Sequence, residues 1–297
     1  MQTKHLLQLF ALSALWATSF LFTRYTSPLL GPNLVVSLRT LLAATTLLLL
    51  MRLLGKRFPR EHWRELVALG LISVGVPHVM YAWSALHLPA SYGALLGTTS
   101  VLFGSISSAC MKLEAMTKGR AVGCLLGLFG AALLVRLGPV QVSSELVIAA
   151  LTCMFGSALS GLSAPLLKQS MARMDPLSVT AGMHVVAALA LLPGGIHDWP
   201  AAQLSAGPLA AVAVMGIGTS ALAWWAYMLI MRHTTAVGAL SSSFMITGFG
   251  VLYGVVFLHE TTGPALYAGG AILFLAVLLV SGFNPLRVFS RGIGDKS

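Results

Sequence analysis

The chain has 297 residues, of which 57% are hydrophobic and only 9% are charged, and its formal net charge at pH 7 is +10. An ordinary soluble domain carries about 25% charged residues, so this composition excludes a typical soluble fold and favours an integral membrane protein. The 18 lysines and arginines lie in short segments between apolar runs and form no polar face, so we predict no nucleic-acid partner.

Apolar segments of about 17–25 residues, the length that crosses a bilayer, recur along the whole chain with short polar breaks between them. Because lipid offers no partners to backbone hydrogen-bonding groups, each segment is predicted to be a helix. The first segment resembles a secretory signal peptide, but no convincing cleavage site follows it, so we interpret it as a retained helix. The sequence thus predicts an all-α integral membrane protein with ten transmembrane helices, near 6–23, 33–53, 65–84, 90–111, 119–137, 144–165, 176–195, 206–230, 235–257 and 263–283.

The basic residues predict how the chain is oriented in the membrane. With ten spans and a cytoplasmic N-terminus, all but three of the 18 lysines and arginines fall in cytoplasmic segments. The exceptions are Arg24 and Arg136 on the outer side and Arg39 within the second span. Because short cytoplasmic loops are enriched in positive charge, we predict a multi-pass protein of the cytoplasmic (inner) membrane with both termini in the cytoplasm.

The two halves of the chain share a sequence pattern. Glu114 lies between two apolar spans, the second of which is glycine-rich, and Glu260 stands in the same relation to a later pair of spans. Upstream of these glutamates, residues 90–95 (Ala-Ser-Tyr-Gly-Ala-Leu) align with residues 235–240 (Thr-Ala-Val-Gly-Ala-Leu). This spacing predicts an internal repeat of about half the chain length.

The repeat divides the chain into residues 1–138 and residues 139–297, with five predicted spans in each. Since five is an odd number, the second half must enter the membrane from the side opposite to the first. Transporters built from such inverted repeats bind their substrate near the membrane midplane, between the repeats. The pattern therefore predicts transport by alternating access.

Three features occur together in this chain: residues 14–20 (Ala-Leu-Trp-Ala-Thr-Ser-Phe), Arg39 in the second span, and the paired elements around Glu114 and Glu260. In this combination the chain resembles the EamA-type family of the drug/metabolite transporter superfamily, over essentially its whole length. The resemblance implies ten helices in two inverted five-helix repeats. It also implies export of small metabolites, often amino acids, through a central cavity.

The fourth span of each repeat departs from the family pattern. In the family a proline commonly precedes the glutamate within this span, whereas the corresponding positions here are Val101 and Thr247. Without these prolines, we expect the two helices to be less kinked.

No acidic residue is predicted in the middle of a span, since all eight acids fall in loops or at span ends. A carboxylate proton relay has no candidate, which favours a facilitator or coupling through histidine. The mid-span basic residues are Arg39, His78 and, as a weaker candidate, His184. Burial of such residues is costly, so each is a functional candidate.

These basic residues also have structural interpretations. Arg39 would bind a substrate carboxylate or close an outer gate; alternatively, it would snorkel outward or bond to carbonyls of a neighbouring helix. His78 follows Pro77, whose kink suits a cavity wall, but a helix neighbour could equally satisfy its ring. His184 is more consistent with a structural role.

Aromatic and hydroxyl side chains supply the rest of the predicted substrate site, because pockets combine apolar walls with a few polar groups. Trp16, Ser19 and Phe20 share one helical face, and the hydroxyl clusters in the fourth and ninth spans match one another. Alternatively, the hydroxyls serve helix packing and the aromatics anchor the protein at the interface. The predicted substrate-binding residues are Trp16, Ser19, Phe20, Arg39, His78, Tyr81, Thr98, Thr99, Ser100, Trp224, Trp225, Tyr227, Ser241, Ser242 and Ser243.

The sequence carries no P-loop, HExxH or GxSxG motif, and its three cysteines show no metal-binding or disulfide spacing. We therefore predict no enzyme activity, no catalytic residue, no metal and no cofactor. A channel or structural membrane protein is the alternative, although a channel usually needs rings of like residues.

The sequence as a whole favours a secondary transporter or facilitator that exports small metabolites, possibly amino acids. The expected partners are the small-molecule substrate and membrane lipid. The chain would act as a monomer or as a homodimer through the glycine face at Gly123, Gly127 and Gly130, although packing within the bundle is the stronger expectation for these glycines.

Overall fold

The computed structural model describes residues 3–137, 141, 143–233, 242–261 and 263–281. Every regular element in this part of the chain is a helix. The α-helices are α1 (Thr3–Leu30), α2 (Pro32–Leu53), α3 (Trp63–Leu69), α4 (Val76–Ser84), α5 (Ala90–Gly97), α6 (Thr99–Cys110), α7 (Lys118–Leu137), α8 (Ser144–Ser170), α9 (Pro176–Asp198), α10 (Ala206–Ala213), α11 (Ala223–Met231), α13 (Ser243–Leu258) and α14 (Pro264–Ser281). The chain also forms the 3-10 helices η1 (Arg60–His62) and η3 (Trp199–Ala201) and the π-helices η2 (Gly70–Gly75) and η4 (Val214–Leu222).

Six helical segments among the described residues are long and apolar enough to cross a bilayer: 32–53, 60–84, 90–110, 144–170, 176–201 and 206–231. Two shorter apolar helices lie at 245–258 and 266–280. The all-helical membrane architecture agrees with the sequence, whereas the count of ten spans in two repeats stays a prediction.

Large apolar side chains project from the outside of the bundle. Leu125 of α7, Leu151 of α8 and Leu189 of α9 are 71%, 61% and 68% exposed, respectively. A soluble protein rarely exposes so much contiguous apolar surface, whereas lipid tails are a favourable surrounding for it. This surface is therefore the lipid-facing side of the helices.

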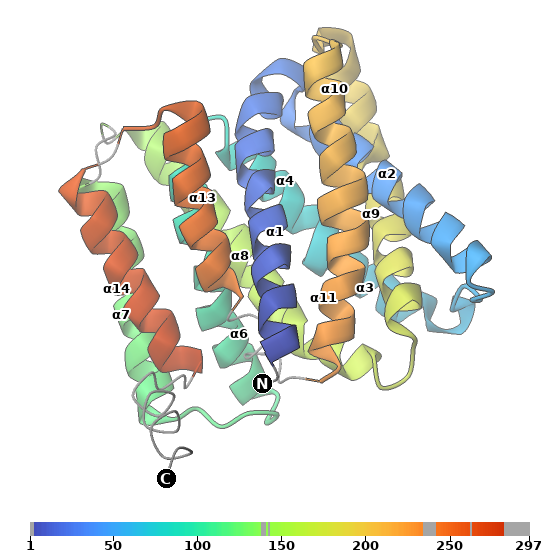
Figure 1. Cartoon of the computed structure of the whole chain (residues 1–297), viewed down its shortest axis with the longest axis horizontal. Coiled ribbons are helices and arrows are strands. Elements are labelled where there is room, and N and C mark those ends of the chain that lie inside the picture. Colours follow the sequence, from blue (N-terminus) through green and yellow to red (C-terminus); the bar gives the residue numbers. More distant parts are fainter. Residues whose placement is uncertain (1–2, 138–140, 142, 234–241, 262, 282–297) are drawn as a thin grey trace.

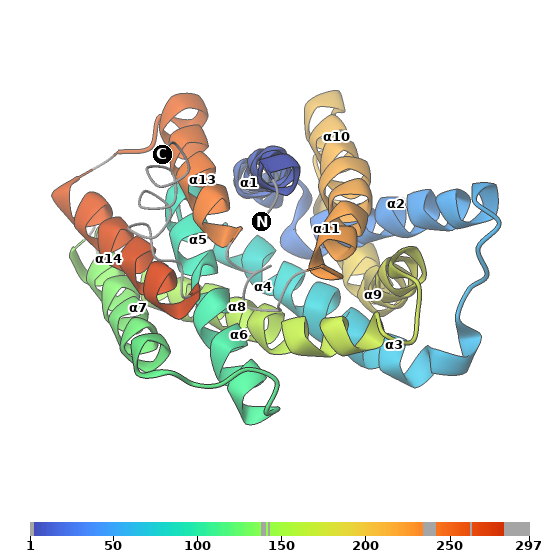
Figure 2. The ribbon, with the colours of Figure 1, turned by 60° about the horizontal axis from the view of Figure 1, so that its bottom comes forward.

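Helices from the two parts of the chain pack side by side. The pair α7 and α14 forms one end of the molecule, and α2 packs against α9 at the other end (Figure 1). Between these pairs, α1 lies against α13, α13 against α5, and α6 against α8. Figure 2 shows α1 seen nearly end-on between α13 and the α10–α11 segment. Each of these pairs joins a helix before residue 138 to a helix after residue 142, so the core is built from both parts together.

Glycines allow the closest of these contacts. A Cβ added at Gly123 would lie 2.7 Å from the Ala276 carbonyl oxygen, and one at Gly130 would lie 2.8 Å from the Ile272 side chain. Gly127 faces Leu102 of α6 in the same way. The glycine face of α7 thus packs against α14 and α6 within this chain, as the packing interpretation expects, and the oligomeric state stays a prediction.

Three of the helical segments are irregular at mid-length. The third predicted span contains the π-helix η2, and the eighth contains η4. In the fourth span the hydrogen bonding changes at Thr98, where Thr98 N donates to Leu95 O and Val101 N donates to Thr98 O. The regular hydrogen bonding of the fourth span is thus interrupted without a proline, since α5 ends at Gly97 and α6 begins at Thr99, and the expectation of a smaller kink stays a prediction. Wider or tighter helical turns leave carbonyls for other partners.

Candidate functional site

A cavity of about 180 Å³ lies between α1, α2, α4, α5, α8, α11 and α13, near the middle of the bundle. Its wall is mostly aromatic and hydroxyl-bearing, with one cationic side chain. Eleven of the predicted substrate-binding residues line it: Trp16, Phe20, Arg39, His78, Tyr81, Thr98, Ser100, Trp224, Tyr227, Ser242 and Ser243.

Four predicted residues lie elsewhere. Ser19 is next to the cavity and donates a hydrogen bond to Thr219 Oγ1 (3.0 Å). Thr99 is fully buried and its hydroxyl donates to Leu96 O (2.6 Å), away from the cavity. Trp225 packs against a separate apolar cluster that includes Leu177. Ser241 lies outside the described residues.

Sequence reasoning missed part of the cavity wall. Ser73 of η2 and Ser160 of α8 line it, as do the small or apolar residues Ala94, Gly97, Ala164, Leu167, Met231 and Ile246. Small residues in a membrane helix usually serve packing, so nothing in their local sequence separates them from packing residues. Gly70 and Gly75, the first and last residues of η2, are the sequence signal that lies nearest to Ser73.

Arg39 holds its guanidinium against η4. Its Nε donates to Ser220 Oγ (2.5 Å), and its Nη2 donates to Thr219 Oγ1 (3.2 Å) and to Ser19 Oγ (3.4 Å). The remaining nitrogen, Nη1, has only the Met215 sulfur at 4.0 Å. Because Arg39 is 7% exposed, it does not snorkel to the membrane surface, and its partners are side chains rather than backbone carbonyls.

The charge of Arg39 has no acidic partner among the described residues. The carboxylates that form ion pairs there, Glu65, Glu114, Asp175 and Asp198, all pair with other residues. No acid lines the cavity, and the one acid outside the described residues, Asp295, is at the C-terminus. A buried charge is normally paired, so this guanidinium is available to an anion.

An aromatic cluster lies beside Arg39 in the cavity wall, since Trp16 and Arg39 both donate hydrogen bonds to Thr219. The rings of Trp16 and Tyr227 lie 4.9 Å apart and those of Trp16 and Trp224 lie 5.9 Å apart, both edge-to-face. The Trp16 indole N–H donates to the Thr219 carbonyl in the π-helix (2.9 Å). The irregular turn of η4 thus supplies the acceptor that fixes the orientation of Trp16.

The two histidines differ in their access to the cavity. His78 lines it, and its Nδ1 is 2.6 Å from Val74 O in η2, which leaves Nε2 for other partners. His184 is fully buried and does not line the cavity. Its Nδ1 contacts Thr180 O (2.8 Å) and its ring packs against Trp224. His184 therefore supports the aromatic cluster, in agreement with the structural interpretation.

Phe20 and Tyr81 close one end of the cavity, with ring centroids 6.3 Å apart. Both rings also line a small void of about 40 Å³ on the far side, beside Pro89 and Cys153. Tyr81 is held by a hydrogen bond to Ser157 Oγ (3.2 Å). Beyond the void, Arg24 Nη1 donates to the carbonyls of Ala85 and Leu86. Aromatic and polar contacts therefore seal this end.

Glu260 also acts at the sealed end. Its carboxylate accepts hydrogen bonds from the backbone N–H groups of Ala90 and Ser91 at the start of α5. The first N–H groups of a helix lack partners within the helix and favour a negative charge. One of the two repeated glutamates thus caps a cavity-lining helix.

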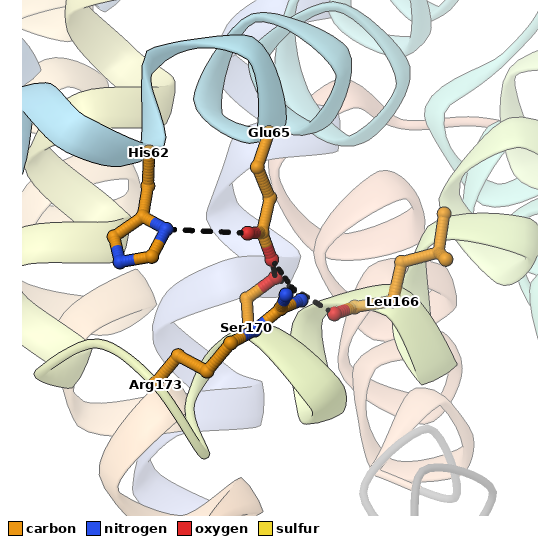
Figure 3. A network of polar contacts seen from close by, with 5 residues as sticks. All are labelled: His62, Glu65, Leu166, Ser170 and Arg173. Atoms are coloured by element: carbon orange, nitrogen blue, oxygen red, sulfur yellow. Dashed lines mark hydrogen bonds and ion pairs between the residues drawn. The ribbon is translucent and has the colours of Figure 1, made fainter.

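A second polar network lies at the opposite end of the bundle (Figure 3). Glu65 at the start of α3 accepts hydrogen bonds from Ser170 and from Arg173 Nη2 (3.0 Å), and His62 Nδ1 lies 3.9 Å from it. Nearby, Lys168 Nζ donates to the Met231 (2.6 Å) and Arg232 (2.8 Å) carbonyls at the end of α11. These contacts tie α8 to α3 and to α11.

The EamA-like transporter family model matches the chain twice, over residues 3–136 and 147–282. The chain belongs to the EamA-like transporter family. It is therefore a multi-pass membrane transporter of the drug/metabolite transporter type, as the resemblance in the sequence implies.

Individual relatives agree with this EamA assignment. The chain is 27% identical over 279 residues to Protein PecM of Dickeya dadantii (strain 3937), covering 93% of this chain and 91% of the relative. It is 21% identical over 271 residues to an uncharacterized transporter of Archaeoglobus fulgidus, covering 89% and 94% of the two chains. A crystal structure at 19% identity superposes with a TM-score of 0.72 and covers 99% of this chain and 100% of that one, which supports the fold alone.

Proposed function

We propose that this protein exports small metabolites that carry a carboxylate, amino acids among them, through the central cavity by alternating access. The observation that carries the proposal is the acid-free cavity whose wall combines Arg39 with an aromatic cluster. A cavity of this kind fits a small ligand with one anionic group and an apolar part.

Alternating access is supported by how the helices pair. In the two proposed five-helix repeats, 1–138 and 139–297, each helix has a counterpart at the same position. When each helix is replaced by its counterpart, the contact between α6 and α8 becomes the contact between α13 and α1. The same exchange turns the contact of η2 with α9 into that of η4 with α2, and both contacts occur. Two halves that pack equivalently offer two states of similar energy, as transport from one side to the other requires.

The proposed orientation places the sealed end of the cavity outside. Residues Leu167, Met231 and Ser242 line the other end, next to the basic residues Lys168 and Arg232 that the charge bias assigns to the cytoplasm. In this orientation the structure corresponds to a state closed to the outside, in the cytoplasmic membrane, with both termini in the cytoplasm.

The acid-free cavity also supports facilitated transport rather than proton coupling through a carboxylate. His78 is the remaining candidate for a proton carrier, since it lines the cavity and only its Nδ1 is held by Val74 O. A channel or structural role is less well supported, because the cavity is closed by Phe20 and Tyr81. We propose no catalytic residues.

The test is uptake of a labelled amino-acid mixture into proteoliposomes, with and without an imposed pH gradient. We expect saturable uptake that the gradient does not change. Uptake driven by the gradient would instead point to proton coupling through His78. A His78→Gln variant would then lose the gradient-driven uptake. No uptake in either condition would contradict the proposal for amino acids.

A further inference from the structure

We propose that the cavity recognises its ligand by the carboxylate alone: the guanidinium of Arg39 binds the carboxylate of an organic monoanion, the aromatic cluster holds its apolar body, and no carboxylate of the protein pairs with an ammonium. This inference rests on the proposed function and narrows its substrate class. It predicts that a carboxylic acid without an amino group is bound as well as the corresponding amino acid.

The first argument is the geometry of Arg39. Its Nε and Nη2 are occupied by Ser220, Thr219 and Ser19, which fix the plane of the guanidinium against η4. Among the described residues Nη1 contacts only the Met215 sulfur at 4.0 Å, and sulfur is a weak acceptor. A carboxylate forms short, charge-assisted hydrogen bonds with arginine, so a ligand carboxylate would complete the donors that the protein leaves open.

The cavity offers a cation no counter-charge. Hydroxyl side chains line it but no carboxylate does, and the positive charge of Arg39 repels an ammonium nearby. Aromatic faces attract cations by about 0.5–2 kcal/mol, but the Trp16, Trp224 and Tyr227 rings meet one another edge-to-face and their first role is to enclose apolar atoms. An amino group therefore gains little here.

The third argument is the nature of the wall around Arg39. Trp16, Phe20, Tyr81, Trp224 and Tyr227 come from three helices, α1, α4 and α11, and line a space of about 180 Å³. Aromatic side chains combine large apolar area with little conformational freedom. They form a rigid box suited to a ligand with a compact apolar or aromatic body.

The experiment compares three ligands that differ only in their charged groups: 3-phenylpropanoate, L-phenylalanine and 2-phenylethylamine. Binding to the purified full chain in nanodiscs is measured by tryptophan fluorescence, so the result does not depend on transport. We expect 3-phenylpropanoate to bind at least as tightly as phenylalanine. We expect phenylethylamine to bind at least about tenfold more weakly, as loss of a charge-assisted hydrogen bond implies.

Two variants locate the effect. Arg39→Gln should weaken binding of both carboxylates at least about tenfold and bring all three affinities together, whereas Arg39→Lys should keep the anion preference. Arg24→Gln is the matched control, because Arg24 binds the Ala85 and Leu86 carbonyls outside the cavity. It should leave the order of the three ligands unchanged.

Binding of phenylethylamine as tight as that of phenylpropanoate, or a clear preference for phenylalanine over phenylpropanoate, would overturn the inference. So would binding of none of the three. If phenylpropanoate binds as expected but no carboxylate is carried across proteoliposomes, the site stands and the proposed transport fails. If amino acids are carried across proteoliposomes but the three ligands show no preference for the anion, the proposed transport stands and the inference about carboxylate recognition fails.

Discussion

At the scale of single residues, the site depends on two side chains fixed by one irregular turn. Arg39 bonds to the Thr219 and Ser220 hydroxyls of η4, and Trp16 bonds to the Thr219 carbonyl. Trp16 is on α1 and Arg39 is on α2, and both side chains bond to η4, which comes from the other half of the chain. A change in η4 would therefore reorient the Arg39 guanidinium and the aromatic wall together.

Replacement of Trp16 by Phe tests this contact. The variant keeps an aromatic ring but loses the N–H that binds Thr219 O, and a typical hydrogen bond contributes about 1 kcal/mol. We expect transport of the labelled amino-acid mixture to fall about fivefold with normal insertion into the membrane. Trp225→Phe is the matched control, since Trp225 packs outside the cavity, and an equal loss in both variants would argue against a role for the indole N–H.

The sequence predicted most of the site residues, but not which of two neighbouring residues on a helix faces the cavity. Trp16, Arg39 and His78 were identifiable because large or charged side chains in mid-span are costly unless they have a role. Thr99 and Trp225 were included because they neighbour Thr98 and Trp224, yet one step along a helix turns a side chain by about 100°. Ser73 and Ser160 were missed because a serine in a membrane helix ordinarily packs against a neighbour.

At the scale of helices, close packing and irregular turns have different sequence signals. The glycines of α7 predicted its close approach to another helix, and α14 is the partner. The π-helices η2 and η4 were not predicted, because no residue pattern specifies an extra residue in a helical turn; tertiary contacts decide it. The change of hydrogen bonding at Thr98 was likewise not predicted, because no proline marks it.

Replacement of Gly123 by Ala tests the α7–α14 contact. The added Cβ would lie 2.7 Å from the Ala276 carbonyl oxygen, a backbone atom that cannot rotate away. Overpacking of this kind costs about 1–3 kcal/mol, so the thermal unfolding midpoint in detergent should fall. Gly248→Ala, where a Cβ meets nothing within 4 Å, should leave the midpoint unchanged or raise it slightly. A Gly123→Ala protein as stable as the wild type would contradict this packing.

At the scale of the whole molecule, helices from both parts of the chain pack together around the cavity. The all-helical architecture followed from the apolar segments, because backbone groups in lipid have no other way to be satisfied. Orientation rests on the basic loops alone. It therefore calls for a direct measurement.

Single cysteines placed at opposite ends of the bundle test the orientation. In a Cys110→Ser background, the other two cysteines are buried. A membrane-impermeant maleimide added to intact cells should label Gln203→Cys, near the sealed end, and should label Lys56→Cys only after permeabilisation. Labelling of Lys56→Cys in intact cells would reverse the orientation.

We propose that substrate passes through the cavity, and a cavity-filling variant tests this proposal. Ala164 of α8 lines the cavity, whereas Leu162 on the same helix is 42% exposed on the outer surface. Uptake of the labelled amino-acid mixture should be compared in proteoliposomes of the wild type, Ala164→Phe and Leu162→Phe. We expect saturable uptake by the wild type and by Leu162→Phe and almost none by Ala164→Phe. Uptake by a correctly inserted Ala164→Phe at the wild-type rate would contradict it.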